Sequence, residues 1–159
     1  MKKLIIILFL ILVSCSSNNN INNDVVKEDN NMIDNNVVKE ENMVDNKLIL
    51  EIDGKEIDVI WEDNESIKDL KNKIEDELVI EMSIYSNFEQ FGPLGFNLIS
   101  NDTRITSEIG DIFLYNSNNI VLFYGENTWS YTRLGKINMD DNEIIDLLSK
   151  KDVTITLHK

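Results

Sequence analysis

The side chains best suited to chemistry lie between Gly110 and Gly135, where two apolar, aromatic-rich runs flank a polar turn and lead into a segment rich in Trp, Tyr and Arg. Tyr and Trp offer a wide apolar face with one polar group, so such a cluster can line a ligand pocket; filling of the core is the alternative. Because successive strand residues face opposite ways, we expect only one of Phe123 and Tyr124 to point inward. The candidates for a binding surface here are Trp129, Tyr131 and Arg133.

Arg133 has two possible roles. It is one of two arginines in an acidic stretch of chain, so it can bind a ligand carboxylate or a backbone carbonyl. Pairing with a neighbouring Asp or Glu is the more common role of such a residue.

The other ionisable residues do not form a recognised catalytic or metal-binding pattern. A helix cap explains Asp140 and Asp141. Asp111 is not part of a calcium-binding loop pattern. His158 has no companion histidine or cysteine near it, and neither a nucleophile elbow nor a phosphate-binding loop occurs. We therefore expect no metal and no cofactor, and we assign no catalytic residue.

Residues 1–14 are typical of a bacterial lipoprotein signal peptide. Lys2 and Lys3 precede an unbroken apolar run from Leu4 to Val13, which is too short to span about 30 Å of hydrocarbon. Cys15 is the only cysteine and stands where lipid attachment requires a thiol, although an ordinary secretory signal is the alternative. We expect a protein lipidated at Cys15 and anchored by lipid to a membrane of the bacterial cell envelope.

The charge of the chain argues against one class of partner. Removal of the signal peptide leaves 13 basic against 29 acidic side chains, a formal charge of −16. Such a surface repels phosphate backbones, so we expect no nucleic-acid partner. We expect the domain to be a monomer.

Residues 15–46 are predicted to be a disordered Asn/Asp-rich linker behind the lipidated cysteine. Two degenerate copies of one short polar repeat lie within it, from Asp24 to Asn35 and from Asn36 to Asn46. Low hydrophobicity with negative charge favours a flexible spacer over an amphipathic partner-binding segment. As a coil it would hold the domain about 30 Å from the anchor.

Residues 47–159 are predicted to form the folded domain. Two apolar runs joined by Asp53-Gly54 indicate a β-hairpin, and Asp63 or Asn64 is expected to cap a helix that begins at Glu65. The alternation from Leu78 to Tyr85 predicts one strand.

The second half of the domain is predicted to be richer in strands. Residues 86–109 look loop-rich, with Gly92-Pro93 as a turn. Strands are expected at 111–115, 120–124 and 152–157, and a second helix at Asp140 or Asp141. The absence of a βαβ rhythm favours a mainly β fold, a closed barrel capped by two short helices.

Several segments of the domain resemble the bacterial cyclophilin-like domain family, whose members often follow a lipoprotein signal. These segments are Glu81-Met82-Ser83, Phe88-Glu89-Gln90, Gly92-Pro93-Leu94-Gly95, Gly110 to Tyr115, Phe123-Tyr124-Gly125 and Trp129 to Ile137. The resemblance covers roughly residues 47–159 and implies a cyclophilin-like β-barrel, without implying an activity.

The isomerase pattern of true cyclophilins is incomplete in this chain. That pattern has an Arg five residues before a Phe and a Gln three after it, whereas Ser83 and Phe91 hold these positions around Phe88, with Gln90 displaced by one. Their Trp is followed five residues later by His, but Leu134 stands five residues after Trp129.

The sequence therefore predicts a lipid-anchored module that binds a small molecule or an extended peptide in an aromatic groove. A divergent peptidyl-prolyl cis-trans isomerase is the alternative function, and a structural surface protein is a third. The candidate groove residues are Phe88, Gln90, Phe123, Trp129, Tyr131 and Arg133.

Overall fold

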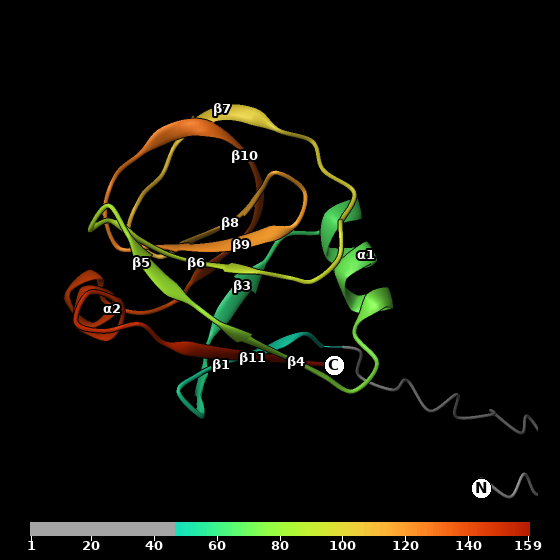
Figure 1. The fold of residues 1–159 in the computed structure, drawn as a ribbon, viewed down its shortest axis with the longest axis horizontal. Coiled ribbons are helices and arrows are strands. Elements are labelled where there is room, and N and C mark those ends of the chain that lie inside the picture. Colours follow the sequence, from blue (N-terminus) through green and yellow to red (C-terminus); the bar gives the residue numbers. More distant parts are fainter. Residues whose placement is uncertain (1–46) are drawn as a thin grey trace, which may run out of the picture. The chain divides into compact units, whose positions relative to one another are not determined.

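Two antiparallel β-sheets and two short helices make up residues 47–159, the part of the chain that the computed structural model describes (Figure 1). The four-stranded sheet has the order β2-β1-β11-β4. The seven-stranded sheet has the order β3-β10-β8-β9-β6-β5, and β7 pairs with β10 outside that path. The first sheet consists of β1 (Ile49–Ile52), β2 (Lys55–Ile57), β4 (Glu77–Glu81) and β11 (Thr154–His158). The second consists of β3 (Val59–Trp61), β5 (Ser83–Tyr85), β6 (Glu89–Pro93), β7 (Thr103–Thr106), β8 (Asp111–Tyr115), β9 (Asn119–Phe123) and β10 (Thr128–Ile137).

The prediction of a closed barrel is wrong for the described residues. Neither sheet closes on itself, and the chain instead passes between the two sheets four times, twice through a helix and twice at a single residue. Asp58 separates β2 from β3, and Met82 separates β4 from β5. The Met82 amide donates to Val153 O at 2.9 Å, and its side chain is buried in the core. The predicted strand from Leu78 to Tyr85 is therefore two strands, one in each sheet, because the chain bends where it changes sheet.

Both predicted helices are confirmed, together with their capping residues. The Asn64 side chain accepts from Ile67 N at 3.0 Å at the start of α1 (Glu65–Lys73). Its Nδ2 also donates to Arg133 O at 2.8 Å, which ties the start of the helix to β10. Asp140 accepts from Asn142 N at 2.9 Å at the start of α2 (Asp141–Leu148). Each cap satisfies a backbone amide that the first helical turn leaves without a partner.

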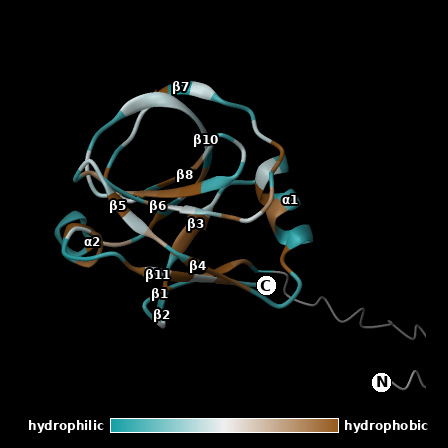
Figure 2. Ribbon diagram, viewed as in Figure 1, coloured by the Kyte–Doolittle hydropathy of each residue, from teal (hydrophilic) through white to brown (hydrophobic). Residues whose placement is uncertain are grey.

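The central strands β8 and β9 are buried on both faces of the seven-stranded sheet. Ile112, Leu114 and Leu122 face the main core, to which the four-stranded sheet and the helices also contribute. Phe113 and Phe123 face the other way, into a smaller aromatic cluster that also contains Val121 and Tyr131. Figure 2 shows β8 coloured as hydrophobic, whereas the curved arc of β10 is mostly pale.

Burial on both faces corrects one prediction about orientation. Phe123 and Tyr124 point to opposite faces, as strand alternation requires, but both are buried. Phe123 belongs to the aromatic cluster and Tyr124 to the main core.

The prediction that residues 86–109 are loop-rich is also wrong in part, because β6 and β7 lie there. Gly92 is not in a turn: it pairs with Ile120 inside β6. A Cβ at Gly92 would come within 2.6 Å of both Ile80 and Met82, so this glycine allows close packing of β6 against β4. Pro93 is the last residue of the strand.

The predicted signal peptide of residues 1–14 and the predicted linker of residues 15–46, including Cys15, lie outside the described residues. Between residues 47 and 159 no helix has the length and apolar composition that crossing a membrane requires.

Candidate functional site

A pocket of about 500 Å³ opens on the aromatic face of the seven-stranded sheet. Strands β5, β6, β8 and β10 contribute to it, together with the β5–β6 turn and the loop after β9. The residues that line it are Tyr85, Ser86, Phe88, Glu89, Phe91, Tyr115, Asn127, Trp129 and Tyr131. Six of these nine side chains are aromatic, so the pocket can hold an apolar or π-binding group.

Strand register places the polar centre of the pocket among aromatic side chains. Glu89 lies opposite Tyr85 of β5 on one side and opposite Phe123 of β9 on the other. Directly opposed residues share one face of a sheet, so these three side chains point the same way. The turn that makes this pairing possible has positive φ at Ser86 (48°) and Asn87 (63°), which lets β5 and β6 pair directly.

The aromatic rings around the pocket support one another. Phe88 stacks on Phe123 with ring centroids 6.4 Å apart, and Phe123 meets Tyr131 edge to face at 5.5 Å. Tyr131 contacts Tyr115 at 5.9 Å, and Tyr85 contacts Phe88 at 6.3 Å, both edge to face. Such contacts stabilise ring orientations beyond the contribution of buried area, so the rings that form the pocket walls support one another's positions.

The rim of the pocket is exposed. The side chains of Tyr85 and Trp129 are 57% and 54% exposed, unlike the buried rings beneath them. Trp129 is the second residue of β10, where the strand pairs with β7, and it lies opposite Ile105. Large exposed aromatic side chains around a concave site are typical of a ligand-binding surface.

Glu89 is the acidic group of the pocket. It is only 7% exposed, and its Oε2 atom has no hydrogen-bond partner among the described residues. Burial raises the pKa of its carboxyl from 4.5 to about 7, because the charged form is poorly solvated there. A buried polar atom without a partner is rare in folded proteins, so Glu89 is a candidate for ligand contact.

Tyr131 adds a hydroxyl group beside this carboxyl. Burial, together with the negative charge of Glu89, raises the pKa of Tyr131 to about 12, so it stays protonated. Asn127 Nδ2 donates to the Tyr131 hydroxyl at 2.8 Å. The phenolic proton is therefore left available for a bound acceptor.

Comparison with known proteins assigns the domain. The family model described as the Cyclophilin-like family matches residues 50–158, which takes in nearly all of both sheets and both helices. The chain belongs to the cyclophilin-like family. The predicted family resemblance is confirmed. No curated protein and no solved structure matches the chain significantly.

The cyclophilin-like domain brings together three of the six predicted groove residues. Phe88, Trp129 and Tyr131 line the pocket. Phe123 is fully buried beneath it, in contact with the rings of Phe88 and Tyr131.

Gln90 lies on the opposite face of β6 from the pocket. It is fully buried, and its Nε2 donates to Leu148 O at 2.6 Å and to Lys151 O at 2.7 Å. The side chain therefore satisfies carbonyls at the end of α2 and fixes that helix to the sheet.

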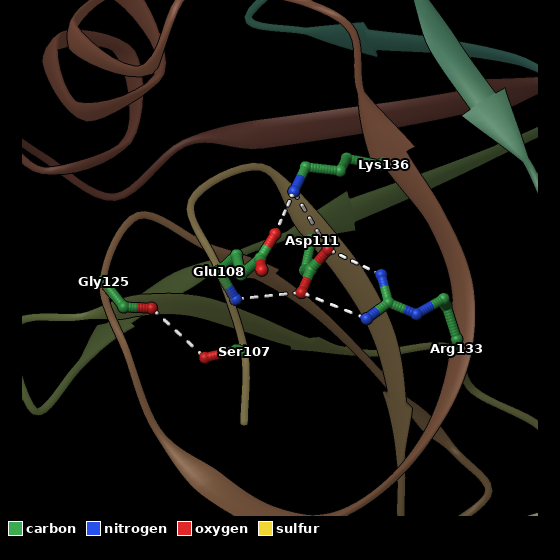
Figure 3. Close-up of polar contacts among 6 residues, drawn as sticks. All are labelled: Ser107, Glu108, Asp111, Gly125, Arg133 and Lys136. Carbon is green, nitrogen blue, oxygen red and sulfur yellow. Dashed lines mark hydrogen bonds and ion pairs between the residues drawn. The ribbon is translucent and has the colours of Figure 1, made fainter. Parts of the chain in front are cut away.

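Arg133 is paired with an acidic residue, the more common of its two predicted roles. Figure 3 shows its guanidinium facing the Asp111 carboxylate. Arg133 Nη1 lies 2.7 Å from Asp111 Oδ1. Asp111 is fully buried and also accepts from Glu108 N at 2.9 Å, and Lys136 Nζ lies 3.8 Å from it. The guanidinium covers the Phe113 ring at 4.9 Å. This arrangement holds β8, β10 and the turn before β8 together.

Sequence reasoning missed the most polar part of the pocket. Glu89 was not a predicted site residue, nor were Tyr85, Ser86, Phe91 and Asn127. A signal was present, since Glu89 lies between Phe88 and Phe91 and a carboxylate inside an aromatic run is unusual in a buried strand.

Replacing Arg133 with alanine is expected to destabilise the fold. The variant leaves a buried Asp111 carboxylate without its closest cationic partner, which should cost about 2 to 3 kcal/mol of unfolding free energy. Denaturant unfolding measures this loss. Arg104→Ala, the other arginine and an exposed one, should stay within about 0.5 kcal/mol of the wild type. Equal losses in the two variants would contradict a structural role for the Asp111–Arg133 pair.

Glu89 is expected to make stability depend on pH. Its folded-state pKa of about 7 exceeds the ordinary 4.5, so the folded protein binds this proton more tightly than the unfolded chain. The protonated Glu89 carboxyl thus contributes to the free energy of unfolding. This contribution is complete at low pH and is lost as the pH rises from 4.5 through 7. Relative to Glu89→Gln, the wild type should therefore lose up to about 3 kcal/mol between pH 4.5 and pH 8.

Denaturant unfolding across that pH range tests the prediction, with the exposed Glu126→Gln as the matched control. Parallel stability curves for the wild type and Glu89→Gln would show that the carboxyl is not poorly solvated in the folded protein.

Proposed function

We propose that the protein is a lipid-anchored binding module of the cell envelope that takes a small molecule or an extended peptide into its aromatic pocket. The observation that carries the proposal is the pocket itself, in which six aromatic side chains surround one buried and unpartnered carboxyl. Concave sites with mostly apolar walls and a few polar groups are the usual form of ligand pockets.

The pocket supports binding more strongly than prolyl isomerisation. An isomerase needs a donor aimed at the amide nitrogen of the proline, a role suited to a guanidinium group. Among the described residues, no arginine lines the pocket. Arg133 is engaged by Asp111, and Gln90 is engaged by carbonyls of the α2 end.

Ligand binding should depend on Trp129. A fragment library with cationic, anionic and neutral members is screened for fragments that perturb the fluorescence of the purified protein. These fragments should bind to Trp129→Ala at least about tenfold more weakly than to the wild type, because an aromatic side chain at the rim supplies much of the contact. Calorimetry or ligand-observed NMR measures the change in affinity.

Ile99→Ala is the matched control, since Ile99 is as exposed as Trp129 (55% against 54%) and does not line the pocket. Binding unaffected by Trp129→Ala would place the ligand elsewhere. With a chromogenic proline peptide the wild type should not accelerate isomerisation; acceleration that Trp129→Ala abolishes would instead favour the isomerase function.

The anchoring part of the proposal rests on Cys15 and the apolar run before it. Cells that express the wild type should incorporate labelled palmitate into the protein and retain it in the membrane fraction, because two or more acyl chains give lasting attachment. Cys15→Ser should lose the label, whereas Ser16→Ala should keep it. Labelling of Cys15→Ser would contradict lipidation at this residue.

A further inference from the structure

The unpartnered carboxyl of Glu89 lies inside the pocket that the proposed function uses. Within residues 47–159, its buried Oε2 atom has no hydrogen-bond partner, and no Lys or Arg lines the pocket. A buried carboxylate without a partner is costly, and the cost falls when a cation pairs with it. Within the described part of the chain, no side chain supplies such a cation at this position.

The walls of the pocket also favour a positively charged ligand. Aromatic rings present a negative face, to which ammonium and guanidinium groups are attracted within about 6 Å of the ring centre. The lining includes the rings of Phe88, Tyr115, Trp129 and Tyr131. The net charge of the chain, −14, adds a long-range field that attracts cations and repels anions.

The hydrogen bonds around Glu89 also leave it free for a ligand. Asn127 and Tyr131, which both line the pocket, are bonded to each other: the Asn127 amide donates to the Tyr131 hydroxyl at 2.8 Å. The titratable groups around the carboxyl are tyrosines of the pocket and of the adjacent core, namely Tyr85, Tyr115, Tyr124 and Tyr131. Burial and the charge of Glu89 raise the pKa of both Tyr124 and Tyr131, so these two stay neutral near pH 8.

We propose that the pocket binds the ammonium group of an organic cation, with the Glu89 carboxylate as its counter-ion and the rings of Phe88, Trp129 and Tyr131 around it. The inference rests on the proposed binding function and names its ligand class. A volume of about 500 Å³ accommodates such a head group together with part of the molecule that carries it.

Matched pairs of probes test the charge of the ligand. At pH 8 the purified protein is titrated with choline and with its neutral isostere 3,3-dimethylbutan-1-ol. A second pair comprises capped Gly-Lys-Gly and Gly-norleucine-Gly peptides. Fluorescence of Trp129 in a Trp61→Phe background reports binding, and saturation-transfer NMR on the wild type serves as a second measurement if that background lowers stability.

We expect at least one cationic probe to bind at least about tenfold more tightly than its neutral partner, a difference of about 1.4 kcal/mol. Glu89→Gln should abolish this preference, and the exposed Glu126→Gln should retain it. Preference for choline alone supports a small-molecule ammonium cation as ligand, and preference for the lysine peptide alone supports a peptide side chain.

Two results would overturn the inference: neutral probes that bind as tightly as their cationic partners, or a preference that survives in Glu89→Gln. Either result leaves the binding function intact if fragments still depend on Trp129. Failure of every fragment and probe to bind would instead overturn the proposed function itself.

Discussion

The structure depends on one constraint: strands β8 and β9 carry apolar side chains on both faces, so each face of the seven-stranded sheet must be covered. The four-stranded sheet and the helices cover the side of Ile112, Leu114 and Leu122. On the other side the cover is smaller: Tyr131 of β10 packs on Phe113 and Phe123, and Phe88 of the β5–β6 turn stacks on Phe123. Strand β7 pairs with the curved start of β10 (Figure 1). The pocket opens where this second cover is incomplete, and its aromatic character follows from the cluster on which it lies.

Features with a local cause could be predicted from the sequence. Asp53-Gly54 forms its hairpin because both residues adopt positive φ, and Asn64 and Asp140 cap helices through amides two or three residues away. The aromatic strand pair also followed from composition and alternation, since β8 and β9 are rich in residues that favour strands.

Features with a distant cause could not be predicted in this way. In the sequence Gly92 is typical of a turn, and only the packing of Ile80 and Met82 against it explains its place in a strand. The chain bends at Asp58 and Met82 because the strands before and after each of them pair in different sheets. Residues Asp111 and Arg133 are 22 positions apart, and only the register of β8 with β10 joins them. For the same reason only half of the predicted groove residues line the pocket. The aromatic ones cluster in sequence, but which of Glu89 and Gln90 faces the pocket depends on the orientation of β6.

Glu89 and Gln90 are neighbours in sequence, but their side chains have different roles. This difference bears on how the sequences of family members can diverge. Gln90 is bound to the end of α2 and belongs to the scaffold, whereas Glu89 faces a pocket whose lining side chains lie on the other face of the sheet from the main core. Mutations on the pocket face can therefore change the pocket lining with little disturbance of the core that holds the two sheets together. Under the proposed binding function, such changes alter which ligand the pocket accepts while the scaffold stays the same.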